Sequence, residues 1–257
     1  MKRQSALKVI PIVLFMAFSS LFGAESDKAL SQNSRPRVLI IGDSISIGFT
    51  PYVAEMLKGE ATIQHHKGNA QDTGTGLKLL DQWIGTTPWK VIHFNWGLWD
   101  LCYRHPDSKV QGNRDKFKGT ITTSPEQYER NLEELVRRLQ RTGATLIWAE
   151  TTVVPEGEAG RIVGDDTKYN DIAARVMRRH GIRIDDLHTL TKGFAPDLFA
   201  APGNVHYTKD GYQKIAAQVA DRIRAALNGE PGRREDRPPG GGTKGQAGAH
   251  TAVPGKP

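Results

Sequence analysis

The chain has 257 residues, of which 38% are hydrophobic and 25% are charged, and Cys102 is its single cysteine, so a disulfide scaffold is excluded. Its formal net charge of +7 lies mainly at the two ends, because residues 1–24 contribute +3 and residues 228–257 contribute +2. The remaining residues hold 27 basic and 25 acidic side chains, so nucleic acid is not an expected partner.

The first 24 residues have the composition of a secretory signal peptide. Three basic residues precede an apolar run over 9–18, and small residues follow up to Ala24. The run is shorter than the roughly 20 apolar residues that a membrane span needs. We predict a signal peptide over 1–24, a linker over 25–35, and export to the periplasm or the extracellular space. Phe22 stands where cleavage favours a small residue, so an uncleaved anchor, which would bring the protein to a membrane, is the alternative.

Short apolar segments alternate with helical patterns over residues 36–227. Strands are predicted at 37–41, 61–65, 91–94, 145–149 and 182–184, and helices at 51–57, 76–84, 125–139, 166–180 and 208–227. This alternation predicts one α/β domain in three layers, with helices on both faces of a central parallel sheet of about five strands. Ligands bind beyond the carboxyl ends of such strands, so functional side chains are expected directly after them.

The last 30 residues differ from the rest in composition. Residues 228–257 contain eight Gly and five Pro and almost no large apolar side chain. Such a segment cannot bury enough apolar surface to offset the entropy of ordering it, so we predict a disordered tail.

A serine and a histidine are predicted to lie at the carboxyl edge of the sheet, where ligands are expected to bind. Ser44 follows the first strand in Gly-Asp-Ser, on a strand-to-helix turn that would expose its hydroxyl beside a helix N-terminus. A helix cap is the alternative role for Ser44. His206 lies on the loop that enters the last helix and returns to the same edge, so it is the candidate base. No histidine pair has the spacing of a zinc site, and we expect neither a metal nor a cofactor.

Four segments resemble the sequence blocks of the SGNH (GDSL-like) hydrolases, over about Pro36 to Leu227. The resemblance implies an esterase on a flavodoxin-like fold, with Ser44 as nucleophile, His206 as base, and the N–H groups of Ser44 and Gly68 as oxyanion donors. The matching segments are Gly42-Asp43-Ser44, Lys67-Gly68-Asn69-Ala70-Gln71-Asp72-Thr73, Phe94-Asn95-Trp96-Gly97-Leu98-Trp99-Asp100 and Val205-His206-Tyr207-Thr208.

One departure from the family concerns the oxyanion site. Trp99 stands where the family has its oxyanion Asn. We predict that Asn95 supplies the missing side-chain donor from the end of the third strand, and the indole N–H of Trp99 is the alternative donor. A packed core Asn and a lid Trp are the alternatives for these two residues.

The second departure concerns the acid that orients the histidine. Gly203 stands where the family's Asp would lie, and the neighbouring Asn204 cannot ionise. The imidazole must then be oriented by a carbonyl group, by Asn204, or by a distant acid such as Asp197 or Asp186. Asp43, beside the nucleophile, is a further candidate supporting residue. Loss of the acid can slow such an enzyme by orders of magnitude and still leave a working Ser-His pair.

The surrounding loops favour a small acyl group on a carbohydrate. They are polar and aromatic rather than aliphatic, and aromatic rings suit sugar stacking, although about half of these rings are expected in the core. The rings are those of Trp83, Trp89, Trp96, Trp99 and Tyr103. The basic segment 104–118 could receive an acidic polysaccharide, or be a solvated loop.

The predicted function is therefore that of an exported, monomeric serine esterase that removes O-acetyl groups from a small-molecule or polysaccharide ester. Two alternatives remain at this point. A lysophospholipase or thioesterase of the same fold would prefer long acyl chains. A carbohydrate-binding relic without activity would explain the missing Asp and Asn.

Overall fold

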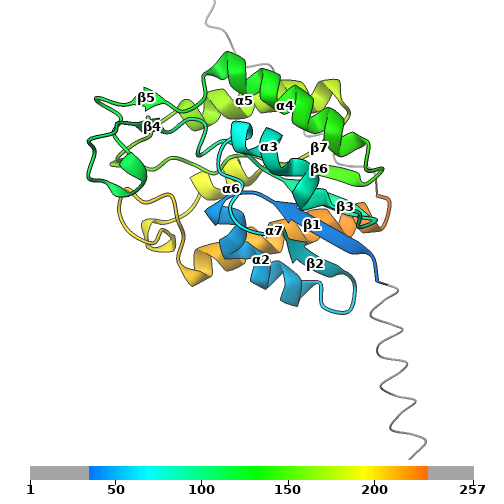
Figure 1. Ribbon diagram of the computed structural model, residues 1–257. Coiled ribbons are helices and arrows are strands. Elements are labelled where there is room, and N and C mark those ends of the chain that lie inside the picture. Colours follow the sequence, from blue (N-terminus) through cyan, green and yellow to red (C-terminus); the bar gives the residue numbers. More distant parts are fainter. Residues whose placement is uncertain (1–34, 231–257) are drawn as a thin grey trace, which may run out of the picture.

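The computed structural model describes residues 35–230 (Figure 1). The predicted signal peptide at 1–24 lies outside the described residues, as does most of the predicted linker and of the predicted tail. Within the described part of the chain, no helix combines the length and the apolar character needed to cross a membrane.

A parallel sheet of five strands forms the middle layer, as predicted. The strands are β1 (Arg37–Ile41), β2 (Thr62–His65), β3 (Val91–Phe94), β6 (Thr145–Ala149) and β7 (Arg183–Asp185), in the order β2-β1-β3-β6-β7. This order is that of flavodoxin-like sheets. All four residues of β3 are buried, the polar His93 among them, because helices cover the central strands on both faces.

Five helices form the two outer layers. Figure 1 shows α2 and α7 on one face of the sheet and α3, α4 and α5 on the other. Their bounds are α2 (Ser44–Met56), α3 (Thr73–Ile84), α4 (Pro125–Gln140), α5 (Asp165–Arg179) and α7 (Lys209–Leu227). The predicted three-layer α/β/α fold is therefore confirmed.

Helix α2 begins seven residues earlier than the predicted start at Pro51. Asp43 caps it, because its Oδ1 accepts a hydrogen bond of 2.9 Å from the N–H of Ile45. Pro51 favours the first turn of a helix, yet here it lies inside α2. The correction matters for function, because the early start makes Ser44 the first residue of the helix.

Short elements that sequence patterns did not predict lie at the carboxyl ends of the strands. After β3 the chain forms an antiparallel hairpin of β4 (Tyr103–Arg104) and β5 (Thr120–Ile121), seen beside the carboxyl end of the sheet in Figure 1. Helix α6 (Leu187–Lys192) follows β7. The hairpin segment, residues 103–121, includes both strands and the chain between them. It packs on the loop after β6, since the N–H of Tyr103 donates to Gly160 O at 2.7 Å and that of Lys116 donates to Ala159 O at 3.0 Å.

Candidate active site

The side chains of Ser44 and His206 meet at the carboxyl edge of the sheet. Ser44 Oγ lies 2.9 Å from His206 Nε2, and both residues are half-buried. Ser44 starts α2, whereas His206 lies on the loop that enters α7, and these two helices pack together on one face of the sheet. The fold thus brings the predicted nucleophile and base to hydrogen-bond distance.

Asn204 orients the imidazole. Its Oδ1 accepts from the backbone N–H of His206 at 3.0 Å and lies 2.8 Å from the ring atom Nδ1. Because a backbone N–H can only donate, the atom that faces it must be the amide oxygen. The same oxygen can accept only from a protonated Nδ1, so Nε2 carries the lone pair that accepts the Ser44 hydroxyl proton.

The backbone at Gly203, where the family has its acid, disfavours any residue with a side chain. Its φ of +68° lies in the left-handed region, and a Cβ added there would stand 2.8 Å from the carbonyl oxygen of Gly157. An aspartate at this position would meet both obstacles. The chain therefore uses the neutral amide of Asn204 in place of a carboxylate.

The two distant acids lie elsewhere. Asp197 is exposed in the 3-10 turn Pro196–Leu198, and Asp186 caps α6 by accepting from the N–H of Thr189 at 2.7 Å. Within residues 35–230, the hydrogen bonds to the imidazole of His206 are those with Ser44 and Asn204.

The environment of His206 favours the neutral ring. Burial lowers the pKa of His206 from its ordinary value, and the positive charges of Arg161 and Arg114 lower it further. A neutral ring at neutral pH can act as a base. The same surroundings make the imidazolium less stable once the proton has been transferred, because no carboxylate of residues 35–230 is hydrogen-bonded to it.

The two backbone N–H groups predicted as oxyanion donors lie on neighbouring segments at the carboxyl edge of the sheet. The N–H of Ser44 lies at the N-terminal end of α2, where the helix dipole favours negative charge. Gly68 lies exposed in the loop after β2 with a φ of +88°. That loop is docked on the end of β1, because the N–H of Ala70 donates to Gly42 O at 3.0 Å.

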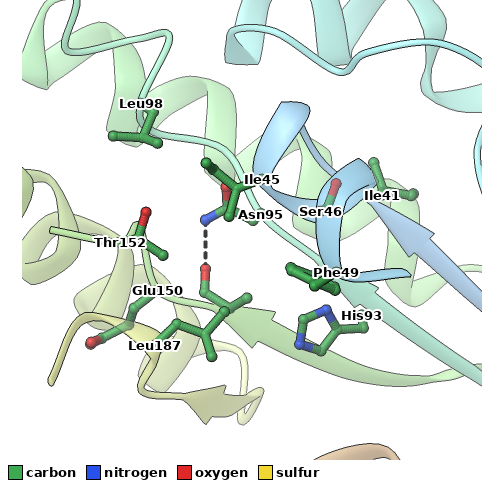
Figure 2. Close-up of a pocket in the computed structure, with 11 residues that line it drawn as sticks. Ile41, Ile45, Ser46, Phe49, His93, Asn95, Leu98, Glu150, Thr152 and Leu187 are labelled. Carbon is green, nitrogen blue, oxygen red and sulfur yellow. Dashed lines mark hydrogen bonds between the residues drawn. The ribbon is translucent and has the colours of Figure 1, made fainter. Parts of the chain in front are cut away.

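Asn95 and Trp99 both have neighbours of their own. Asn95 Nδ2 donates to the carbonyl of Ala149 at 2.7 Å, the dashed bond in Figure 2, and so ties the end of β3 to β6. Asn95 also lines a small cavity under α2, together with Ile45 and Ser46. The ring of Trp99 lies under the guanidinium of Arg104, 4.5 Å from ring centre to Cζ. The oxyanion role of either side chain stays a prediction.

Asp43 is the N-cap residue of α2. Its carboxyl is buried and caps α2, and burial raises its pKa, against the lowering effects of the Ile45 N–H and of Arg161. Asp43 therefore helps to fix the backbone that carries Ser44.

The aromatic side chains proposed to stack on sugar divide into two groups. Trp96 and Trp89 are buried, so they belong to the part of this set that was expected in the core and cannot stack on a sugar. Trp83, Trp99 and Tyr103 are half-buried. Trp83 packs on the ring of His66 at 4.3 Å.

A buried charged cluster beside the site was missed in the sequence. Glu158 and Arg161, on the loop after β6, are both buried, and Arg114 of the hairpin segment joins them. Glu158 Oε1 lies 2.6 Å from Arg114 Nη1 and 2.9 Å from Arg161 Nη1. The signal was present, since a Glu and an Arg three residues apart follow a predicted strand at the edge where ligands bind.

One family model and several solved structures match this chain. The model of the GDSL-like Lipase/Acylhydrolase family matches residues 40–214. No curated protein sequence matches the chain.

Solved structures share the fold at low sequence identity. The acetyl xylan esterase AlAXEase is 14% identical, with a TM-score of 0.58 over 73% of this chain and 99% of that one. The lipase/acylhydrolase from Enterococcus faecalis is 16% identical, with a TM-score of 0.60 over 74% and 96%. A catalytic mutant of Axe2, an acetylxylan esterase from Geobacillus stearothermophilus, is 14% identical, with a TM-score of 0.58 over 73% and 94%.

Proposed function

The chain belongs to the GDSL-like lipase/acylhydrolase family, which supports hydrolysis of ester bonds, and from this premise we propose that it is an exported serine esterase that removes acetyl or other short acyl groups from carbohydrate. The observation that carries the proposal is the chain of hydrogen bonds from Ser44 through His206 to Asn204, with contacts of 2.9 and 2.8 Å. A relic that only binds carbohydrate would not need a serine hydroxyl aligned on a base of fixed tautomer.

The proposed reaction is acyl transfer in two steps. His206 Nε2 takes the hydroxyl proton as Ser44 Oγ attacks the ester carbonyl carbon, and the N–H groups of Ser44 and Gly68 stabilise the resulting oxyanion. The imidazolium then gives its proton to the leaving sugar oxygen as the carbon–oxygen bond breaks, which leaves an acyl-Ser44 ester. In the second step His206 takes a proton from water, water attacks the acyl carbon, and the carboxylic acid is released as Ser44 regains its proton.

The short acyl preference and the carbohydrate substrate are inferred from the surroundings of the site and from similar folds. Polar and half-buried aromatic side chains, among them Trp99 and Tyr103, surround the edge of the sheet. Two of the similar folds are described as acetyl xylan esterases. A third is described as a lipase/acylhydrolase, so a long-chain esterase of the same mechanism is the second candidate. Export follows from the predicted signal peptide alone, and the monomeric state also stays a prediction.

Labelling with a fluorophosphonate tests the nucleophile, with Ser44→Ala as the variant and Ser46→Ala as the matched control on the same helix. We expect labelling and nitrophenyl acetate hydrolysis in the wild type and the control, and neither in Ser44→Ala. Absence of both from the wild type would refute the esterase and favour the binding relic.

A series of nitrophenyl esters with growing acyl chains tests the acyl preference. We expect the highest kcat/KM at two carbons, and a maximum at about eight or more would favour the long-chain alternative. Release of acetate from a panel of acetylated polysaccharides then identifies the sugar. No release from any of them, with nitrophenyl acetate still hydrolysed, would contradict the carbohydrate substrate.

A further inference from the structure

Arg161 is a buried cation beside the catalytic edge. Its side chain is only 5% exposed. Its Nε donates to the carbonyl of Leu98 at 2.7 Å, and its Nη1 lies 2.9 Å from Glu158 Oε1. Leu98 directly precedes Trp99, the residue that stands where the family has its oxyanion Asn. Arg161 is therefore anchored one residue from the position of the missing donor.

The charge of Arg161 acts on the groups around Ser44. It lowers the pKa of Asp43, which precedes Ser44 in the chain, although burial raises that pKa more strongly. It also lowers the pKa of His206, second to the effect of burial. These two groups flank the nucleophile, so the guanidinium lies within electrostatic range of the reacting atoms.

The cluster around Arg161 keeps an excess positive charge. Arg161 and Arg114 share a single carboxylate, that of Glu158, whose Oε2 also accepts from the N–H of Gly160 at 2.7 Å. Two guanidinium groups on one carboxylate leave a net charge of +1. A buried charge that is not fully compensated costs stability, so a negatively charged partner would offset it.

The Nη2 group of Arg161 takes no part in these hydrogen bonds. Among residues 35–230, the hydrogen bonds of Arg161 run through Nε and Nη1 and leave Nη2 without a partner. Asn95, by contrast, already uses an amide hydrogen on the carbonyl of Ala149.

We propose that Arg161 is the side-chain donor of the oxyanion hole, with Nη2 donating to the substrate carbonyl oxygen as it becomes negative. The inference rests on the proposed esterase function, and it names the group that replaces the family's Asn. A charged donor suits this site, because Asn204 leaves the imidazolium without a carboxylate and the transition state needs stabilisation from elsewhere. Hydrogen bonds from a charged donor are roughly twice as strong as those between neutral groups.

Substitution of Arg161 tests the proposal in two graded steps. We expect Arg161→Gln to lower kcat on nitrophenyl acetate by about 10² to 10³, with KM changed by less than about threefold, because the interaction forms mainly in the transition state. Arg161→Lys keeps the charge but not the reach of Nη2, so an intermediate loss is expected. Arg179→Gln, in the last turn of α5, is the control, since it removes a guanidinium that is ion-paired with Glu129 and Glu133 away from the site, and it should change kcat by less than about twofold.

A boronic acid gives a readout that needs no turnover. It adds to Ser44 Oγ as a tetrahedral anion, so its affinity should fall in Arg161→Gln by about the same factor as kcat. Near-ultraviolet circular dichroism checks the fold of each variant, and the lysine variant keeps the test decisive if the glutamine variant does not fold.

The outcomes separate the two proposals. An active wild type with Arg161→Gln or Arg161→Lys at full kcat would overturn the role of Arg161 alone. A loss confined to KM, and seen only for substrates that carry a carboxylate, would also overturn it and assign Arg161 to binding a substrate anion. A wild type without any esterase activity would refute the proposed function, while equal boronic acid affinity in the wild type and the variants would still refute the oxyanion role.

Discussion

Placing an acid at Asn204 should strengthen the base, whereas placing it at Gly203 should not. Asn204 Oδ1 already accepts from the backbone N–H and from Nδ1 of His206, at 3.0 and 2.8 Å. Asn204→Asp keeps both acceptors and adds a negative charge next to the ring. The imidazolium that forms in the transition state would then be stabilised, as it is in a triad with an acid.

The size of the gain follows from the geometry. Two unit charges about 4 Å apart attract by roughly 4 kcal/mol at an effective dielectric constant near 20. Both side chains are only half-buried, so solvent screening reduces this to about 1–2 kcal/mol. Since about 1.4 kcal/mol corresponds to a factor of ten in rate, kcat/KM should rise roughly 5- to 30-fold on its alkaline plateau.

The assay is the pH profile of kcat/KM for nitrophenyl acetate. The new carboxylate favours the protonated ring, so the acid limb of Asn204→Asp should also move to higher pH. Gly203→Asp, the control, meets a φ of +68° and the carbonyl of Gly157 at 2.8 Å from its Cβ, and should be less stable with no gain in rate. An Asn204→Asp variant with the plateau and acid limb of the wild type would refute the role of Asn204. A faster Gly203→Asp would refute the steric argument.

Three further predictions concern pH and packing. Because burial and two arginines lower the pKa of His206, the wild-type kcat/KM should fall only below pH 6.5, and an acid limb above that value would contradict the assigned environment. Burial raises the pKa of Asp100 from 3.8 to about 7, so the folded protein retains a proton that the unfolded chain loses, and the free energy of unfolding should fall by up to roughly 4 kcal/mol as pH rises through this range. Urea titrations at pH 5 and pH 8 measure this fall, and Asp100→Asn should remove most of it. An equal change in the free energy of unfolding between the two pH values in wild type and variant would contradict the prediction. A methyl group at Gly48 of α2 would overlap the ring of Tyr212 on α7, so Gly48→Ala should cost about 1–3 kcal/mol in thermal unfolding, whereas Ile47→Ala on the exposed side should cost less than about 1; similar costs would contradict this packing.

The regular part of the fold could be predicted because its signals are local. The strand at 37–41 is an apolar run, and the helix at 125–140 begins with a cap and a proline, so each pattern is complete within its own segment. The start of α2 was misplaced because Pro51 is typical of a first turn, while Asp43 and Ser44 can equally occur in a loop. The hairpin strands have two residues each, which is too short for a periodicity.

The site could be predicted only in part, because the group that orients His206 and the position of Arg161 depend on contacts between distant segments. The predicted strand order placed Ser44 and His206 at the same edge of the sheet. It left several candidates for the group that orients the imidazole ring. That choice depends on the turn at Gly203, which packs against Gly157. Arg161 stayed unrecognised for the same reason, since its acceptor is the carbonyl of Leu98, 63 residues away.

The interlocked loops at the carboxyl edge affect how this enzyme could be remodelled. The hairpin segment holds the loop after β6 through the bond from Tyr103 to Gly160 and the ion pair of Arg114 and Glu158, and that loop supports the turn at Gly203 through Gly157. A hairpin exchanged for that of a relative would therefore disturb the base as well as the entrance. Successful grafts should transfer the hairpin, the loop after β6 and the turn before His206 as one unit.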